Sequence, residues 1–188
     1  MRKTTLSILM LSLIALVMTS CNLFKSEQER KIVGKWHISN AAAADTTTEV
    51  IDDGITLKYI YEGSCTYETE KKTYYAGTFQ YVINLYDEYS IILKYKFSAT
   101  GTWEIKDSRL YEKTSDANVS FAGMELSDPN MYELQQLANQ YKQNIAANFL
   151  PEFKSDLLTP DDSKIVKVDD NELVLSDEDG PTTYRRLN

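Results

Sequence analysis

Hydrophobic and polar residues alternate along several stretches of the chain. In residues 91–97 the odd-numbered positions are Ile, Leu, Tyr and Phe, and the even-numbered positions include two Lys. In residues 55–62 Ile, Leu and two Tyr alternate with Thr, Lys, Ile and Glu. A period of two places successive side chains on opposite faces of a strand. Both segments are therefore predicted to be strands with unequal faces.

Shorter runs of the same kind fill most of the chain after residue 31, separated by turn signals such as Asp53-Gly54 and Asp179-Gly180. The predicted strands are 33–39, 49–51, 55–62, 65–70, 73–85, 91–97, 101–105, 109–113, 164–168, 172–176 and 182–187. Residues 41–49 are expected to form a loop, and Gly77 to mark a bend or bulge. Short strands at this spacing are typical of an antiparallel all-β domain.

One segment has helical spacing instead. Between residues 131 and 149 apolar residues recur every three or four positions. Ser127 or Asp128 is expected to cap this helix, with Pro129 in its first turn. Pro151 is expected to end it, because proline disfavours helical geometry in the residue before it. The apolar stripe indicates a helix that lies against the sheet or covers one end of a barrel; docking of a partner protein is the alternative.

The first 20 residues have the pattern of a signal peptide. Arg2 and Lys3 precede an apolar run at 6–17, and small residues then lead to Cys21. The run is shorter than the roughly 20 residues that a membrane span needs. Met18-Thr19-Ser20-Cys21 resembles a bacterial lipoprotein signal, which implies a mature chain that begins at a lipidated Cys21 and is anchored in the cell envelope, at the outer membrane. A plain secretory signal would share the same basic and apolar parts.

The expected organisation is a signal peptide at 1–20, a lipid-anchored tether at 21–30 and one domain at 31–188. Cleavage would leave 168 of the 188 residues, which suits a single core. Loss of two basic residues would change the formal net charge from −8 to −10. An acidic body repels phosphate groups, so nucleic acid is not an expected partner. With Cys21 lipidated, only Cys65 remains, and no internal disulfide can form.

Two tryptophan motifs resemble those of a known family. Gly34-Lys35-Trp36 resembles the G-x-W signature of lipocalins and lipocalin-like domains, in which the Trp closes the bottom of an antiparallel barrel and an Arg from the last strand lies over the indole. Arg185 and Arg186 occupy the matching place in this chain. Residues 101–110 are similar to a hairpin of lipocalin-like lipoproteins from Bacteroidota. The resemblance implies a mainly β fold: an antiparallel lipocalin-like β-barrel with one amphipathic α-helix before the last strands.

Tyrosine is unevenly distributed, because nine of the thirteen Tyr lie between Tyr59 and Tyr95. A tyrosine ring suits a half-buried strand, and its hydroxyl can orient a ligand. If the sheet closes, the inward-facing Tyr59, Tyr61, Tyr81 and Tyr95 could line a cavity for a small amphipathic molecule. Packing of these rings in a filled core is the alternative.

Residues suited to catalysis or metal binding are few. His37 is the only histidine, so no multi-histidine metal site can form, and we expect a structural role. Cys65 is expected to be a small buried hydrophobic residue and not a reactive thiol. Acidic pairs such as Asp161-Asp162 fall in predicted turns, where Asp serves the backbone. We therefore expect no catalytic residue, metal or cofactor.

Together these observations favour a lipid-anchored binding or carrier domain without catalysis, whose ligand is a small apolar or amphipathic molecule. The membrane would be contacted through the N-terminal lipid. The alternative is an envelope protein-interaction or structural module that has no small-molecule ligand and docks a protein partner instead.

Overall fold

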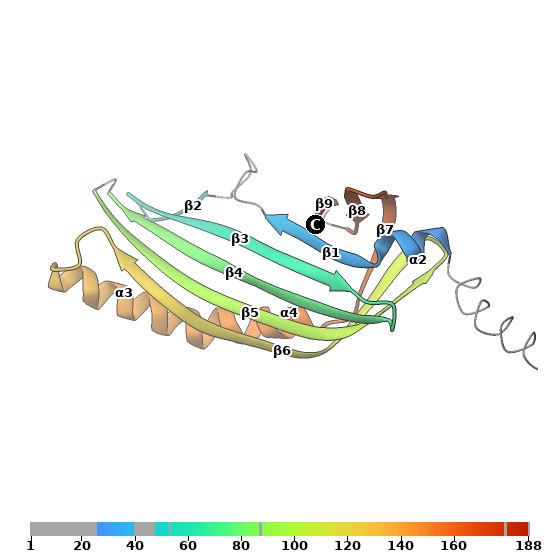
Figure 1. Ribbon diagram of the computed structural model, residues 1–188. Helices are drawn as coiled ribbons and strands as arrows, with labels where there is room; N and C mark the ends of the chain where they lie inside the picture. Colours follow the sequence, from blue (N-terminus) through green and yellow to red (C-terminus); the bar gives the residue numbers. More distant parts are fainter. Residues whose placement is uncertain (1–25, 40–47, 53, 87, 179, 188) are drawn as a thin grey trace, which may run out of the picture.

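The computed structural model describes residues 26–39, 48–52, 54–86, 88–178 and 180–187 (Figure 1). The predicted signal peptide and Cys21 lie outside these residues, as does most of the predicted loop at 41–49. No helix within the described ranges is both long enough and apolar enough to cross a membrane.

Within this part of the chain, nine strands form one antiparallel sheet, and a long helical segment comes before the last three. The strands are β1 (Gly34–Ser39), β2 (Thr48–Asp52), β3 (Ile55–Tyr67), β4 (Lys72–Leu85), β5 (Tyr89–Lys106), β6 (Arg109–Leu126), β7 (Asp161–Val168), β8 (Glu172–Ser176) and β9 (Pro181–Arg186). The helices are α2 (Glu27–Ile32), α3 (Tyr132–Asn144), the π-helix η1 (Ile145–Phe149) and α4 (Leu150–Leu158). The prediction of a mainly antiparallel β fold with one helical segment before the last strands is confirmed.

The hydrogen-bonded pairing of the strands returns to its starting point. The strand order is β1-β9-β8-β7-β6-β5-β4-β3-β2, and β1 also pairs with β3. Eight strands thus form a ring of pairings, and β2 is attached to the outer edge of β3. Only the ends of the long strands take part in this ring: β1 pairs with residues 62–67 of β3, and β7 pairs with residues 109–112 of β6.

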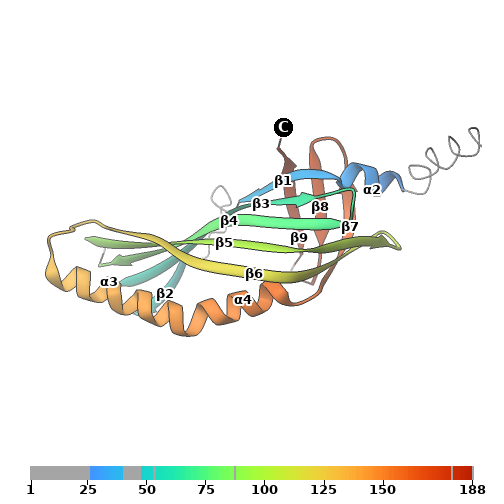
Figure 2. The ribbon, with the colours of Figure 1, turned by 60° about the horizontal axis from the view of Figure 1, so that its bottom comes forward.

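The molecule therefore has two ends. At the closed end, β1 and β7–β9 complete the ring beside α2 (Figure 2). At the open end, β3–β6 continue as a curved sheet whose inner face is covered by α3, η1 and α4 (Figures 1 and 2). The open end comprises residues 55–61, 79–85, 89–97 and 119–126.

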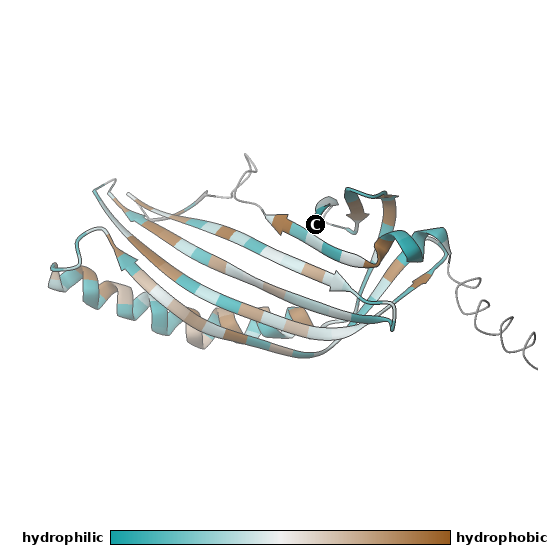
Figure 3. Cartoon of the chain, in the orientation of Figure 1, coloured by the Kyte–Doolittle hydropathy of each residue, from teal (hydrophilic) through white to brown (hydrophobic). Residues whose placement is uncertain are grey.

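Apolar side chains alternate with polar ones along the long strands, so one face of the sheet is apolar (Figure 3). The buried residues of this face form two hydrophobic cores, one at each end. The buried core of the closed end is Ile32, Trp36, Cys65, Tyr67, Trp103, Leu110, Ile165, Leu173 and Leu175. The buried core of the open end is Phe79, Tyr81, Ile83, Leu85, Ile91, Leu93, Tyr95 and Phe97, together with Leu134 and Ala138 of α3.

The long strands run through positions where the sequence predicts breaks. The predicted strands 55–62 and 65–70 are joined in β3, and 91–97 and 101–105 are joined in β5. The predicted bend or bulge at Gly77 is wrong, because β3 and β4 pair there in continuous register. A Cβ at Gly77 would lie 2.5 Å from the carbonyl oxygen of Glu62 and 2.6 Å from the ring of Phe97. Glycine is there to allow close approach of neighbouring groups.

The predicted limits of the helix are also wrong. Met131 is the N-cap residue and provides no side-chain hydrogen bond, whereas Asp128 accepts one from the backbone N–H of Asn130. Pro151 does not end the helical segment but lies in the first turn of α4. Proline has no N–H to donate, and it follows directly on the place where hydrogen bonding changes from the π-helical to the α-helical pattern. The π-helix η1 joins α3 to α4, so the helical segment continues to Leu158.

The folded part begins earlier than the expected boundary at residue 31. Ser26 and Glu29 form a capping box, in which the Ser26 hydroxyl accepts a bond from the Glu29 N–H and the Glu29 carboxylate accepts one from the Ser26 N–H. Lys71, which follows β3, forms an ion pair with Glu29. Helix α2 is thereby held against the closed end, and it takes up the last four residues of the predicted tether at 21–30.

Candidate ligand-binding site

At the closed end, an indole and a guanidinium from opposite ends of the domain lie in contact. The side chain of Trp36 is fully buried, and its Nε1 donates to the carbonyl of Ile32 at 2.7 Å. The Arg186 guanidinium carbon lies 4.1 Å from the centre of the Trp36 ring. Arg186 also donates to the carbonyl of Val33 at 3.0 Å and to the carbonyl of Lys31. The arginine therefore seals the bottom of the ring and satisfies two backbone acceptors.

Gly34 is the residue that makes room for this contact. Its φ is +142°, a conformation that favours glycine, and a Cβ there would clash with Nη1 of Arg186. Gly34, Trp36 and Arg186 thus meet at one point. The other predicted closure residue, Arg185, is exposed and pairs with His37 across β1 and β9. Of the two arginines, Arg186 is the one over the indole.

The other side chains considered for chemistry have ordinary surroundings. His37 is partly exposed on β1, with its Nε2 4.0 Å from a carboxylate oxygen of Glu62. Cys65 is 1% exposed, and burial raises the pKa of its thiol far above the ordinary value, so the thiol stays protonated. In the described ranges, no three His, Cys, Asp or Glu side chains are grouped as metal ligands.

A partly buried carboxyl group, that of Glu112, lies at the closed end. The Tyr75 hydroxyl donates a hydrogen bond to Glu112, and Tyr67 donates another. Burial raises the pKa of Glu112 to about 7, and the two tyrosine hydrogen bonds oppose this rise. The Glu112 carboxyl therefore titrates close to neutral pH.

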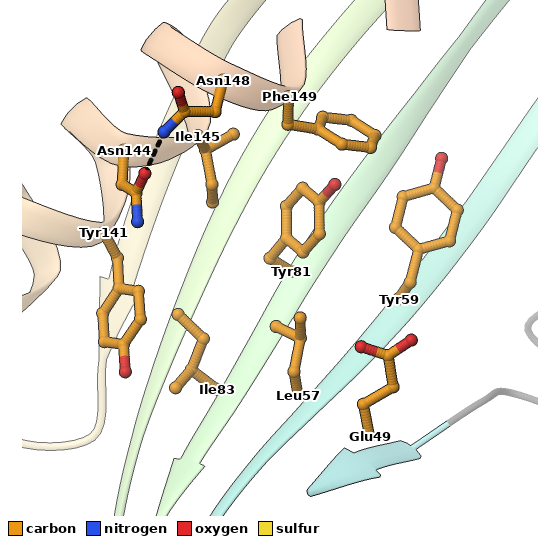
Figure 4. Close-up of a pocket in the computed structure, with 10 residues that line it drawn as sticks. All are labelled: Glu49, Leu57, Tyr59, Tyr81, Ile83, Tyr141, Asn144, Ile145, Asn148 and Phe149. Atoms are coloured by element: carbon orange, nitrogen blue, oxygen red, sulfur yellow. Dashed lines mark hydrogen bonds between the residues drawn. The ribbon is translucent and has the colours of Figure 1, made fainter. Parts of the chain in front are cut away.

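A pocket of about 600 Å³ lies at the open end, between the sheet and the helical segment (Figure 4). Strands β3 and β4 form one wall, α3 and η1 form the other, and β2 contributes to the rim. The lining residues are Glu49, Leu57, Tyr59, Tyr81, Ile83, Tyr141, Asn144, Ile145, Asn148 and Phe149. Apolar walls with a few polar groups are typical of sites for small molecules.

The π-helix η1 shapes the helical wall of this pocket. It places Ile145, Asn148 and Phe149 along one side of the space, just beyond Asn144 at the end of α3. The Asn148 side chain donates a hydrogen bond to the Asn144 side chain, as Figure 4 shows. π-Helical turns are rare and are frequent at functional sites.

Tyrosine hydroxyls provide most of the polar groups on the sheet side. Burial raises the pKa of Tyr59 and of Tyr81 well above the ordinary value. The neighbouring Tyr59, Tyr95 and Glu49 raise the pKa of Tyr81 further. Both hydroxyls therefore stay protonated at any physiological pH and can donate a hydrogen bond to a bound molecule.

The structure separates the four tyrosines that the sequence groups in one cavity. Tyr59 and Tyr81 line the pocket. Tyr61 stacks on Phe97, with ring centres 5.7 Å apart. Tyr95 is 1% exposed and stacks on Phe79 at 5.0 Å, outside the pocket lining, and its hydroxyl has no hydrogen-bond partner among the described residues. The pocket itself lies under the helix at the open end and not within the closed end.

Sequence reasoning missed the helical wall of the site. Tyr141, Ile145 and Phe149 belong to the predicted apolar stripe, which was expected to pack on the sheet or cover one end of a barrel and not to line a pocket. Asn144 and Asn148 are four positions apart and therefore share one helix face, next to that stripe. A pair of amides beside an apolar stripe was the signal that could have indicated a site.

Comparisons with known proteins identify no relative that would assign a function to this pocket. The chain matches no family model and no curated protein.

Proposed function

We propose that this protein is a lipid-anchored lipoprotein of the cell envelope, at the outer membrane, with a lipocalin-like barrel that binds or carries a small apolar or amphipathic ligand without catalysis. The pocket under α3 and η1 is the observation that carries this proposal. Its volume of about 600 Å³ lies within the roughly 300–1,000 Å³ typical of ligand pockets. Its leucine, isoleucine and aromatic walls suit an apolar body, and its hydroxyls and amides suit a polar group.

The closed end supports the lipocalin-like part of the proposal. The ring of eight antiparallel pairings, the buried Trp36 and the Arg186 guanidinium over it match what the G-x-W resemblance implies. The ligand site differs from the one that the resemblance suggests, because it lies at the open end beneath the helix.

The position of α2 supports the proposed anchor. Cys21 precedes Ser26, the first described residue, by five positions. Five residues span at most about 18 Å, since an extended chain covers at most about 3.6 Å per residue. A lipid on Cys21 would therefore keep α2 and the closed end near the bilayer and leave the pocket at the far end of the sheet (Figure 1). A ligand would then enter from the aqueous side.

Binding can be tested with a chain that begins at Asn22, and therefore lacks the lipidated Cys21, and with the neutral fluorophore N-phenyl-1-naphthylamine. We expect saturable fluorescence enhancement with one site per chain. Asn148→Trp places an indole in the pocket and should weaken binding by about tenfold or more, because a tenfold change needs the loss of only about 1.4 kcal/mol. Ala147→Trp is the matched control, since Ala147 is exposed on η1 and does not line the pocket.

Two outcomes would contradict the proposal. One is the absence of saturable binding to the unmodified chain. The other is equal binding by the Asn148→Trp and Ala147→Trp variants, which would place the fluorophore elsewhere. Native mass spectrometry of protein purified from cell envelopes gives an independent check, because a carrier should retain a small molecule of defined mass.

A further inference from the structure

The charge of the pocket lining is negative. Among the described residues that line it, Glu49 is the only acidic or basic one. The described lining residues of the sheet and helix walls provide hydroxyls and amides but include no Lys, Arg or His. A ligand with a carboxylate or phosphate group would therefore meet a negative charge and find no positive partner in the lining.

Three aromatic rings meet on the side of the pocket that Glu49 faces. Tyr59 and Tyr81 have ring centres 5.5 Å apart and are inclined at 55°. Tyr81 and Phe149 have ring centres 5.2 Å apart and are nearly perpendicular, at 88°. Rings at such angles offer π-faces in several directions, and the π-face of an aromatic ring attracts a cation.

The carboxylate of Glu49 is close enough to act on the same space. In Figure 4 it points toward Tyr59 and Tyr81 from the rim. Its negative charge is also among the causes that raise the pKa of the Tyr81 hydroxyl. A carboxylate beside several aromatic faces is the combination that binds alkylammonium groups, because charge attraction and cation–π attraction then act on the same headgroup.

We propose that the pocket selects amphipathic ligands whose headgroup is a positively charged alkylammonium. The headgroup lies between Glu49 and the rings of Tyr59 and Tyr81, and the apolar chain lies along Leu57, Ile83 and Ile145. This inference rests on the proposed ligand-binding function and specifies its ligand class.

The test is displacement of N-phenyl-1-naphthylamine by three amphiphiles with ten-carbon chains, each used below the concentration at which it forms micelles. These are decyltrimethylammonium, decanoate and decanol. We expect the cation to displace the fluorophore at a concentration at least about tenfold lower than decanoate, because the carboxylate of Glu49 and the aromatic π-faces attract a cation and the same carboxylate repels decanoate. Decanol should fall between them.

Charge-matched variants separate a local effect from the general attraction of an acidic protein for cations. Glu49→Gln and Glu152→Gln each remove one negative charge, but Glu152 is exposed on α4 and outside the pocket. We expect Glu49→Gln to reduce the preference for decyltrimethylammonium over decanoate by about fivefold or more and Glu152→Gln to leave it unchanged. Tyr59→Leu should also reduce the preference, because it removes one of the rings.

The outcomes distinguish this inference from the proposed function. If the fluorophore binds but decanoate displaces it as well as the cation does, the inference is wrong and the pocket remains a ligand site. An equal effect of Glu49→Gln and Glu152→Gln would also overturn it. If the fluorophore does not bind at all, the proposed function fails first.

Discussion

The two ends of the sheet bury the same kind of surface in different ways. At the closed end, strands from both termini of the domain complete the ring, and side chains of the sheet fill the interior around Trp36. At the open end, the strands are covered by one helical segment, and a pocket is left where that segment becomes π-helical. The buried core around Trp36 is thus packed by strands, whereas the pocket with mainly apolar walls lies between the sheet and the helical segment.

The difference also concerns how each end is held. The guanidinium of Arg186 joins β9 to the indole of β1 and to two backbone carbonyls. The helical segment is held mainly by packing of partly buried side chains such as Phe149 and Phe153 on the sheet. We therefore expect the closed end to carry more of the stability of the fold and the open end to be the part that can adapt to a ligand.

The largest expected effect comes from removing the indole of the closed end. Trp36→Ala should lower the free energy of unfolding by about 3 to 5 kcal/mol, because it leaves a cavity in a fully buried core and an unstacked guanidinium. Phe149→Ala at the open end is the counterpart and should cost about 1 to 2 kcal/mol, since its ring is only partly buried beside the pocket. Urea denaturation followed by circular dichroism measures both. Equal losses would contradict the proposed division of stability.

A smaller effect should appear as a pH dependence that belongs to the closed end alone. The pKa of Glu112 rises from 4.5 to about 7 on folding. The folded state therefore holds the proton more tightly, so stability from this group is complete below pH 4.5, falls as the pH rises and is lost above about pH 7. The difference should amount to about 3 kcal/mol.

Glu112→Gln removes this titration and keeps a polar group for Tyr75. The variant should match the unmodified chain near pH 4.5 and be more stable at pH 8, as measured by urea denaturation across that range. Glu104→Gln is the control, because Glu104 is exposed on β5 and pairs with Lys106. A difference between Glu112→Gln and the unmodified chain that stays constant from pH 4.5 to pH 8 would contradict the prediction.

Local sequence patterns predicted which segments form strands and helices better than they predicted the residues at which these segments begin and end. Alternation found the strands, because one face of each is buried, and the first and last strands could be matched through Trp36 and the terminal arginines. The outer part of β6 was not found because its register shifts twice against β5, at Thr100/Gly101 and at Lys94/Tyr95. Each shift places one extra residue in β6, and the period of two changes phase there.

The site was predictable only in part, for a related reason. Tyr59 and Tyr81 lie on the inward face that alternation identifies, but the rings of Tyr61 on β3 and Tyr95 on β5 stack on Phe97 and Phe79 instead of lining the pocket. The helical wall depends on the π-turn and on helix continuation past Pro151, and both are set by packing on the sheet and not by local preference. To predict a pocket between a sheet and a helix, one must know how the two are placed relative to each other, and the sequence of a single segment does not give that information.

The smallest expected effect concerns how the helix is held at the open end. Lys142 of α3 lies over the ring of Phe121 of β6, with its ammonium 4.0 Å from the ring centre. Phe121 is 37% exposed, and a cation–π contact at such a site is worth about 0.5 kcal/mol. Lys142→Met keeps an apolar side chain of similar length and removes the charge. We expect amides of residues 132–144 to exchange about twofold faster in hydrogen–deuterium exchange, with amides of β1 and β9 unchanged.

Lys154→Met is the matched control for this last effect, because Lys154 is exposed on α4 and the substitution makes the same charge change. It should leave the exchange of residues 132–144 unchanged. If Lys142→Met instead accelerated exchange in β1 and β9 to the same extent as in α3, the two ends would unfold as one unit. The helix could then not open separately to admit a ligand, and the distinction between a stable closed end and an adaptable open end would be lost.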